Sequence, residues 1–541
     1  MLSHLDPSKK TTLFYKGAKS PSTGNRDMVV PSGGVLGGGS SVNFMMYSRA
    51  QRSDFDAWDM PGWSADEIMP YLRKLETFHG PDPLNSHGYD GPIQVSKGTW
   101  GAKRCQDDFI NAIGKLGYPE MDDLQSLSPG AINGVQRAMK YISPDGKRSD
   151  AAHAYVHPRL TDGKHPNLHV VVETQVDKVL IENGRAVGVQ VLPNSSFHPE
   201  DTTVRTIRAK KLVVVSAGAC GTPLILERSG VGDPAVLGAA GVDVTVDLPG
   251  VGNGYEDHLL QVSVYHTSLG EDETIDAVTR GQRDVAEMMR NNHPMLGWNV
   301  QDITCKLRPS DDEVAALGPA FQKAWNEHFR DIPDRPMTLM SPVSGYPGDP
   351  SGIPPGQYIG LTTFSVYPFS RGHIHITGPS PSDEPNFDTG FFADPDSIDI
   401  LKSRWAYKKS REIMRRMSVY RGELASMHPP FQPDSAAACA PVDSCDPETV
   451  QDISYSEEDD RIIDEWLRKT IGTTWHSMGT CKMAPREKRG VVDEHLSVHG
   501  VSGLKVVDLS IAPKNIGANT NNTALAIGER AADIIIKELG L

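Results

Sequence analysis

The feature that most constrains the fold is the apolar run from Lys211 to Ser216, in which a leucine and three valines follow one another. Continuous apolar runs of this kind are typical of parallel strands that are buried on both faces. The run leads through Ala217-Gly218-Ala219 to a predicted helix at Thr222-Pro223, since proline suits the first turn of a helix. Strand, tight turn and helix in this order indicate an α/β protein, although such a junction alone is most often only structural.

The flanking sequence gives further local signals. Two β-rich pieces precede the valine run, residues 168–173 with 176–181 and then residues 186–192. Ser64 and Glu67 have the spacing of a capping box, which predicts the start of a helix. These elements all belong to the first part of the chain.

The middle of the chain has a different pattern. A helical stretch from Thr274 to Arg290 is followed by strand-like residues 358–366 and 372–377, and then by a helical pattern over residues 405–417. We therefore predict a second domain over residues 261–449, built on an antiparallel sheet. Residues 1–260 and 450–541 would form the first domain, and 541 residues are enough for both.

Charge and composition limit the partners. A formal charge of −15 argues against nucleic-acid binding, which needs a basic face to displace counterions from phosphate. We find no apolar run of the ~18 residues that a membrane span needs, no apolar leader, and no SKL signal at the end, so we expect a cytoplasmic protein without a membrane contact. Six cysteines without CxxC pairing predict neither a metal site nor a disulfide framework.

Four motifs carry residue types suited to cofactor chemistry. The first extends from Gly34 to Tyr47, where glycines let backbone N–H groups approach an anion or a flat ring. The second is the βα junction from Gly218 to Gly232, the third extends from Trp475 to Met483, and the fourth from Val506 to Asn519. A glycine run alone is usually a flexible turn, so the argument rests on all four together.

Together these motifs resemble the signature patterns of the glucose–methanol–choline (GMC) family of FAD-dependent oxidoreductases, in the same order along the chain. The runs VLGGGSSVNFMMYSRA, YPFSRGHIHIT, WAYKKSRE, TTWHSMGTC and GLKVVDLSIAPKNIGANT look most like those of fungal alcohol (methanol) oxidases. The resemblance implies a flavoprotein-type α/β domain that binds FAD, joined to an antiparallel α+β substrate-binding domain. It also implies oxidation of a primary alcohol to an aldehyde, with O2 or another electron acceptor, and it leaves room for a homo-oligomer.

The resemblance further implies which residues bind the cofactor. The segment from Gly37 to Met46 would wrap the FAD, with Asn43 nearest the flavin, while Val176 would meet the adenine through its backbone. The expected cofactor-binding residues are Gly37, Gly38, Gly39, Ser41, Asn43, Phe44, Met45, Met46, Val176, Asp508, Leu509, Asn519 and Thr520.

His476 and Asn519 are the catalytic residues that the resemblance implies. An alcohol gives up its hydroxyl proton and a hydride, so the site needs a base near the oxygen. Histidine titrates near neutrality, and asparagine orients the same oxygen by donating a hydrogen bond. Phe44, Met46 and Trp475 are expected to line a small apolar pocket, although ordinary core packing explains these three residues nearly as well.

The sequence departs from the family pattern in two places. Family members open with a strand, a GxGxxG turn and a helix, and in this sequence no GxGxxG follows a predicted strand. Because the start of that helix normally binds the pyrophosphate of FAD, we expect weak FAD binding and slow alcohol oxidation. The segment Val251 to Gly254 ends in glycine where the family usually has asparagine. Two alternatives to the oxidase therefore stay open, an inactive or interaction-type protein that lacks FAD and a hydroxynitrile lyase on the same scaffold.

Overall fold

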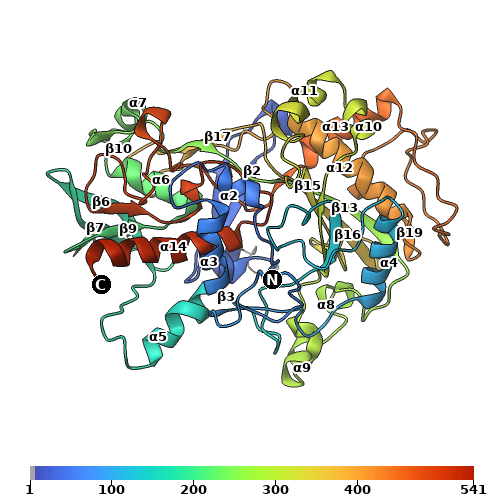
Figure 1. Ribbon diagram of the computed structural model, residues 1–541, viewed down its shortest axis with the longest axis horizontal. Coiled ribbons are helices and arrows are strands. Elements are labelled where there is room, and N and C mark those ends of the chain that lie inside the picture. The colour runs from blue at the N-terminus through green and yellow to red at the C-terminus, as the bar shows by residue number, and fades with distance from the viewer. Residues whose placement is uncertain (1–6) are drawn as a thin grey trace.

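The computed structural model describes residues 7–541, which form two lobes side by side (Figure 1). One lobe is built from both ends of the chain, because α3 (Ala65–Lys74) packs against α14 (Asn521–Leu539). The hydroxyl of Tyr71 in α3 donates a hydrogen bond to Asp533 in α14 at 2.8 Å. The capping box predicted at the start of α3 is present, with Ser64 and Glu67 bonded reciprocally.

The valine run forms β9 (Val213–Val215), which pairs in parallel with β21 (Leu504–Val506). The following helix, α6 (Gly218–Arg228), begins four residues earlier than the predicted start at Thr222. Pro223 therefore lies inside α6, where it cannot donate to the carbonyl of Ala219. The hydroxyl of Thr480 donates to that carbonyl instead, at 2.6 Å, so a distant motif satisfies the group that proline leaves free.

A separate antiparallel sheet has the order β6 (Thr174–Glu182), β7 (Arg185–Pro193) and β8 (Arg205–Arg208). The strand predicted over residues 168–173 is wrong. Val171 and Val172 in that stretch are 64% and 65% exposed, and they belong to no strand. The physical reason lies in the backbone at Glu173, where a φ of +52° interrupts the extended conformation just before β6 begins at Thr174.

The other lobe contains a seven-stranded antiparallel sheet with the order β19-β13-β16-β15-β14-β5, in which β20 also pairs with β13. Its strands are β5 (Gly134–Arg137), β13 (Leu259–Thr267), β14 (Ile303–Leu307), β15 (Thr338–Val343), β16 (Tyr358–Ser365), β19 (Tyr420–Glu423) and β20 (Gly472–Thr473). β5 and β20 come from outside residues 261–449, and the domain boundaries stay a prediction. The long helix α12 (Ile398–Arg415) packs on this sheet and covers the helix predicted over 405–417.

The helix predicted from Thr274 to Arg290 is wrong as one element. It is divided into α8 (Asp276–Thr279) and α9 (Val285–Arg290), because Gly281 between them has a φ of +70°, which ends a right-handed helix. The strand β17 (Gly372–His375) is present as expected, but it pairs with β12 (Asn253–Tyr255) and β18 (Asn386–Asp388) rather than joining the large sheet.

The remaining elements complete the two lobes. The helices are α1 (Gly39–Val42), α2 (Arg52–Asp56), α4 (Lys103–Gly114), α5 (His157–Thr161), α7 (Pro234–Ala239), α10 (Asp311–Ala316), α11 (Pro319–His328) and α13 (Glu457–Thr470). The strands are β1 (Thr12–Gly17), β2 (Met28–Gly33), β3 (Glu76–Phe78), β4 (Ile93–Val95), β10 (Val231–Gly232) and β11 (Val246–Asp247).

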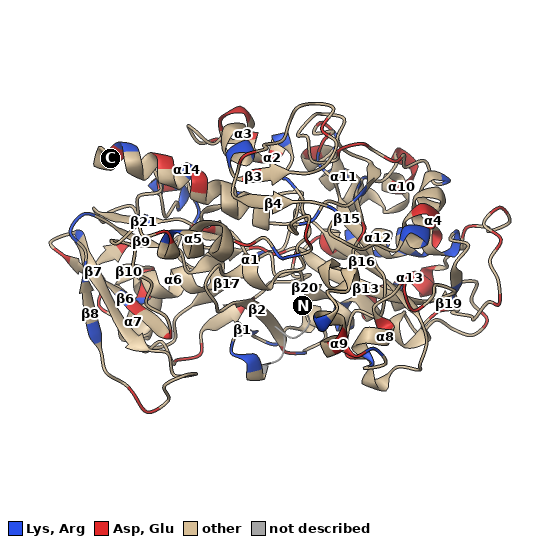
Figure 2. Cartoon of the chain, turned by 90° about the horizontal axis from the view of Figure 1, so that it is seen from below, with Lys and Arg blue, Asp and Glu red and all other residues tan. Residues whose placement is uncertain are grey.

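Charged residues of both signs are scattered over both lobes in the view of Figure 2, and no basic face is visible there. Among the helices of residues 7–541, none combines the length and the apolar character that a membrane crossing requires.

Candidate active site

The glycine-rich motif forms a tight turn between β2 and α1. Gly37 has a φ of +88°, and a Cβ atom there would lie 2.3 Å from the hydroxyl oxygen of Ser41, so only glycine fits. Gly38 and Gly39 differ, because a Cβ at either position would meet nothing within 4 Å. The space beside these two glycines is therefore open, which fits the close approach of a phosphate or a flat ring such as those of FAD. The N–H of Gly38 itself is used within the protein, because it donates to the carbonyl of Val35 at 2.8 Å.

Polar contacts hold the segment after this turn. The side-chain oxygen of Asn43 accepts hydrogen bonds from the backbone N–H of Met45 at 3.0 Å and from Arg148 at 2.9 Å. Arg148 also donates to the carbonyl of Ser40 at 3.1 Å. Met45 has a φ of +58°, a conformation that costs free energy for a residue other than glycine and persists only when its surroundings impose it. The Asn43 oxygen thus serves the protein, and only its amide N–H groups are left for a cofactor.

The predicted pocket residues are brought together in part. The rings of Phe44 and Trp475 stack, with centroids 5.5 Å apart and planes at 4°. Both are half-buried, whereas Met46 is 9% exposed and its sulfur contacts the amide of Asn299 at 3.3 Å. Asn299 also donates to the carbonyl of Phe44 at 2.9 Å. Phe44 and Trp475 are therefore the better candidates for a pocket wall, and Met46 belongs to the core.

His476 is buried and lies at the centre of a polar group. Its backbone N–H donates to Asp257 at 3.0 Å, and its Nδ1 lies 2.9 Å from Nδ1 of His258. Its Nε2 lies 3.4 Å from the side-chain nitrogen of Asn519. Neither ring nitrogen is bonded to the backbone, so the structure brings the two predicted catalytic side chains together at Nε2 of the imidazole.

The surroundings shift the proton affinities of this group. Burial, reinforced by the neighbouring ring of His258, lowers the pKa of His476 well below the ordinary histidine value. Burial lowers the pKa of His258 to about 4 and raises the pKa of Asp257 to about 6. Both imidazoles are therefore neutral at neutral pH, which leaves one nitrogen of His476 able to accept a proton.

We expect the turnover of an alcohol to depend on pH through this base. Protonation removes the lone pair, so kcat/KM should fall as the pH decreases, with a midpoint below the ordinary histidine pKa of about 6.5. Between neutrality and mildly alkaline pH the profile should be flat. Steady-state rates across pH, with circular dichroism as a control for unfolding, measure this, and an acid limb centred above neutrality would contradict it.

Asp508 follows β21 and turns its carboxylate into the protein. One oxygen accepts from the backbone N–H of Gly218 at 3.0 Å and from the hydroxyl of Thr222 at 2.6 Å, and the other accepts from the N–H of Ser510 at 2.7 Å. Burial nevertheless raises the pKa of Asp508, which these hydrogen bonds offset only in part. The predicted contact of Asp508 and Leu509 with the cofactor therefore falls to their backbone.

The remaining predicted cofactor residues belong to the first lobe. Val176, Met45 and Leu509 come from three separate segments, and all are half-buried against one core cluster. Val176 lies beside a β-bulge in β6, a feature that re-aims the local backbone. Thr520 precedes α14, so the free N–H groups of that helix's first turn lie next to Asn519. The first turn of such a helix favours a negatively charged group nearby.

The departure from the family pattern at Gly254 has a local explanation. Gly254 has a φ of +72°, in the left-handed region that glycine adopts at low cost and that asparagine adopts more readily than other residues. A Cβ there would lie 3.1 Å from the side chain of Lys482, a tight contact with a flexible group. Glycine thus preserves the backbone shape that asparagine would have.

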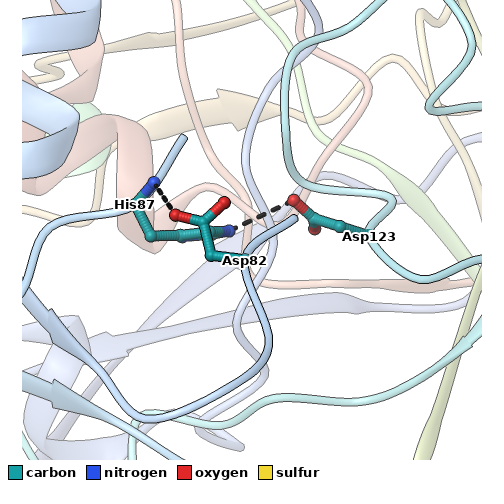
Figure 3. A group of neighbouring side chains, drawn as sticks. All are labelled: Asp82, His87 and Asp123. Atoms are coloured by element: carbon teal, nitrogen blue, oxygen red, sulfur yellow. Dashed lines mark hydrogen bonds and ion pairs between the residues drawn. The ribbon is translucent and has the colours of Figure 1, made fainter. Parts of the chain in front are cut away.

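A second polar cluster contains Asp82, His87 and Asp123 (Figure 3). The ring nitrogens of His87 contact Glu76 at 2.8 Å and Asp123 at 3.2 Å, and its backbone N–H donates to Asp82 at 2.9 Å. Burial alone would lower the pKa of His87, but the hydrogen bonds to Asp123 and Glu76 outweigh it and raise the pKa. Each ring nitrogen of His87 faces a carboxylate, so the cluster in this structure is a network of hydrogen bonds and ion pairs around His87.

Three residues of the site escaped the sequence analysis, namely Asp257, His258 and Asn515. The oxygen of Asn515 lies 2.7 Å from Nε2 of His258, so these residues surround His476 from two other segments of the chain. The adjacent acid and histidine immediately before the apolar residues of β13 were the available signal, because such polar residues are seldom buried without a partner.

The comparisons with known proteins agree on one family. Residues 10–260 and 368–528 match the two models that describe the GMC oxidoreductases. The alcohol oxidase of Candida boidinii is 39% identical over 98% of this chain and 87% of its own length. The oxygen-dependent choline dehydrogenase of Cronobacter sakazakii is 29% identical over 97% of this chain and 85% of its own length.

Solved structures resemble the whole chain. An FAD-dependent oxidoreductase from Chaetomium thermophilum has a TM-score of 0.79 at 25% identity, covering 98% of this chain and 91% of its own. The formate oxidase of Aspergillus oryzae has a TM-score of 0.81 at 21% identity, covering 98% of this chain and 89% of its own. The predicted fold class is thereby confirmed.

Proposed function

Because the chain belongs to the GMC oxidoreductase family, we propose that it oxidises a primary alcohol to the aldehyde, with FAD as cofactor and O2 or another electron acceptor. The observation that carries the proposal is the pairing of His476 with Asn519, whose side-chain nitrogens lie 3.4 Å apart. The ring of Trp475, the residue before His476 in the sequence, stacks on that of Phe44. A base, a hydrogen-bond donor and an apolar wall are the groups that a small alcohol requires.

The cofactor would be held by the segments already described. The turn from Gly37 to Gly39 leaves open space beside Gly38 and Gly39, where FAD could approach the backbone, and Asp508 with Leu509 would offer backbone just after β21. When bound, FAD supplies the acceptor for the hydride that leaves the alcohol carbon. The N–H groups in the first turn of α14 would favour a negative charge on a group that is bound beside Asn519.

His476 takes the hydroxyl proton of the alcohol at Nε2. Asn519 donates a hydrogen bond to the same oxygen, so the oxygen is held while its proton leaves. The imidazolium that forms lies next to the developing negative charge and stabilises it. Asp257 accepts the backbone N–H of His476 and the hydroxyl of Thr473, which fixes the position of the base.

The balanced reaction gives the test. A primary alcohol and O2 would yield one aldehyde and one hydrogen peroxide, so the FAD-loaded protein should form the two products in equal amounts. Cleavage of a cyanohydrin without a redox change would instead indicate the lyase, and a saturated flavin without any turnover would indicate the inactive alternative. The cytoplasmic location and the homo-oligomer stay predictions, which cell fractionation and size-exclusion chromatography test.

We expect Phe44→Ala to change the preferred length of the alcohol. Removal of the ring opens space beside Trp475, so kcat/KM for longer alcohols should rise relative to kcat/KM for methanol. One methylene group in an apolar pocket changes kcat/KM by about 10- to 200-fold, which sets the scale of the change for each added carbon. The ratio of kcat/KM for butanol to that for methanol measures it, with Phe14→Ala, an exposed position, as the control. An unchanged ratio would mean that Phe44 does not line the substrate pocket.

A further inference from the structure

Two side chains behind His476 form a hydrogen-bonded chain with it. The side-chain oxygen of Asn515 lies 2.7 Å from Nε2 of His258, and Nδ1 of His258 lies 2.9 Å from Nδ1 of His476. The same oxygen accepts the backbone N–H of Tyr367 at 3.1 Å. The side chains of Asn515, His258 and His476 are all buried, so water does not share these contacts.

The backbone N–H of Tyr367 determines where the hydrogens of Asn515, His258 and His476 lie. A backbone N–H is always a donor, so the Asn515 atom that faces Tyr367 must be the oxygen and not the amide nitrogen. His258 must then donate from Nε2 to that oxygen. A neutral imidazole has one N–H, so Nδ1 of His258 is left with a lone pair. His476 must therefore donate from its own Nδ1.

We infer that His258 is a positioning residue that holds His476 in the tautomer with hydrogen on Nδ1, so that Nε2 keeps the lone pair that faces Asn519 and the substrate. Asn515 fixes His258 in turn, and the backbone of Tyr367 fixes Asn515. This inference rests on the proposed function of His476 as the base, but the tautomer itself is a property of the protein alone.

Burial is the main reason why His258 and His476 are neutral. Burial, with a further effect of the Lys402 ammonium on α12, lowers the pKa of His258 to about 4, while its hydrogen bond with Asn515 opposes them. Asp257 contacts the backbone and not the ring of His476. If His258 were protonated, both of its nitrogens would donate, and Nδ1 of His476 would become the acceptor. The neutral state of His258 is thus a condition for the base.

The chemical consequence concerns Nε2. A histidine with hydrogen on Nε2 would present a donor to the alcohol and would not remove its proton. The hydrogen bond at one imidazole nitrogen decides which nitrogen is basic, as it does in other sites that use histidine. Loss of His258 would let His476 populate both tautomers and rotate.

Ring-nitrogen NMR of the chain labelled with 15N-histidine tests the tautomer directly, with or without cofactor. The chain has 18 histidines, so the signals of His476 and His258 are identified by their loss in His476→Gln and His258→Leu. We expect hydrogen on Nδ1 of His476 and on Nε2 of His258. Hydrogen on Nε2 of His476 in the unsubstituted protein would overturn the inference.

Two substitutions of His258 test the consequence for the reaction. Leucine removes both contacts, and we expect kcat/KM to fall by about 10- to 100-fold, the usual effect of removing a supporting hydrogen bond, with the loss mainly in kcat. The glutamine amide can donate from its nitrogen to Asn515 and accept at its oxygen from Nδ1 of His476. His258→Gln should therefore recover most of the lost activity and restore the tautomer of His476. Equal activity of the two variants, with folding intact, would overturn the inference.

Asn515→Asp tests the role through charge with little change of shape. Aspartate still accepts from His258 and Tyr367, but its charge raises the pKa of His258, so the acid limb of kcat/KM should move to higher pH by about 1–3 units. His428→Gln is the matched control, because His428 is also buried with a pKa near 4 and contacts Tyr407 and Val264 instead. An acid limb that moves equally in both variants, or in neither, would contradict the inference.

The two claims fail separately. If His476 has the expected tautomer but the loaded protein oxidises no alcohol, the proposed function is wrong and the positioning role stands. If alcohol is oxidised but His476 carries hydrogen on Nε2, the positioning role is wrong and the proposed function stands.

Discussion

Replacement of His476 by alanine should lower kcat/KM for a primary alcohol by about 10²- to 10⁴-fold, the usual contribution of a positioned general base. The expectation follows from the position of Nε2 beside Asn519, since no other side chain that we place at this nitrogen is a base. Stopped-flow and steady-state rates measure the effect. FAD binding should persist, because His476 contacts Asp257, His258 and Asn519 rather than the glycine-rich turn.

A double substitution separates a shared role from two independent ones. His476 and Asn519 would act on the same alcohol oxygen, so the loss in the double variant should be much smaller than the product of the two single losses. Fully multiplicative losses would mean that the two side chains act on different groups. If the single variant His476→Ala retains the full kcat/KM for the alcohol, His476 is not the base.

Replacement of Asp508 by alanine should lower the free energy of unfolding by about 2–4 kcal/mol and weaken FAD binding. Three hydrogen bonds to Gly218, Thr222 and Ser510 are lost, and bonds to a charged group contribute about 1.5–3 kcal/mol each. The net loss of stability is smaller than the sum of these bonds, because a buried carboxylate costs free energy that alanine does not. The raised pKa of Asp508 indicates this cost. Chemical denaturation with and without FAD measures both effects.

Asparagine substitution gives this prediction a matched control. Both oxygens of Asp508 accept backbone N–H groups, so Asp508→Asn places an amide nitrogen against one of them and should also be destabilising. In Asp493 a single oxygen accepts the N–H groups of His495 and Ser497, so Asp493→Asn keeps both bonds. Equal stability of the two asparagine variants would contradict the role assigned to Asp508.

Much of the site could be predicted from the sequence because its motifs are local. The turn that needs Gly37, the strand just before Asp508, and the two motifs that contain His476 and Asn519 can each be recognised within one short segment. The pairing of His476 with Asn519, which lie 43 residues apart, came from the resemblance to the family. Glycine removes a steric clash wherever it stands, so its position in a motif indicates the turn without a structure. The antiparallel sheet of the middle region was predictable for a similar reason, since residues 358–366 have the composition of a strand.

The rest depends on contacts between distant segments. His258 is separated from His476 by 218 residues, and no local pattern shows that their rings meet. The start of α6 at Gly218 depends on the carboxylate of Asp508 from the other end of the chain, so the proline at position 223 was a misleading signal. Residues 168–173 have strand composition, yet the left-handed backbone at Glu173, with a φ of +52°, separates them from β6. Tertiary partners decide such cases, and propensity does not.

The most direct test of the central claim is the reduction of bound flavin by a primary alcohol without oxygen. The protein saturated with FAD is mixed anaerobically with methanol or ethanol, and the flavin absorbance is followed over time. The account predicts that the absorbance bleaches fully, that one aldehyde forms for each flavin, and that His476→Ala slows the bleaching by at least about 100-fold. Stoichiometrically bound flavin that stays oxidised at saturating alcohol, or that bleaches equally fast without His476, would contradict it.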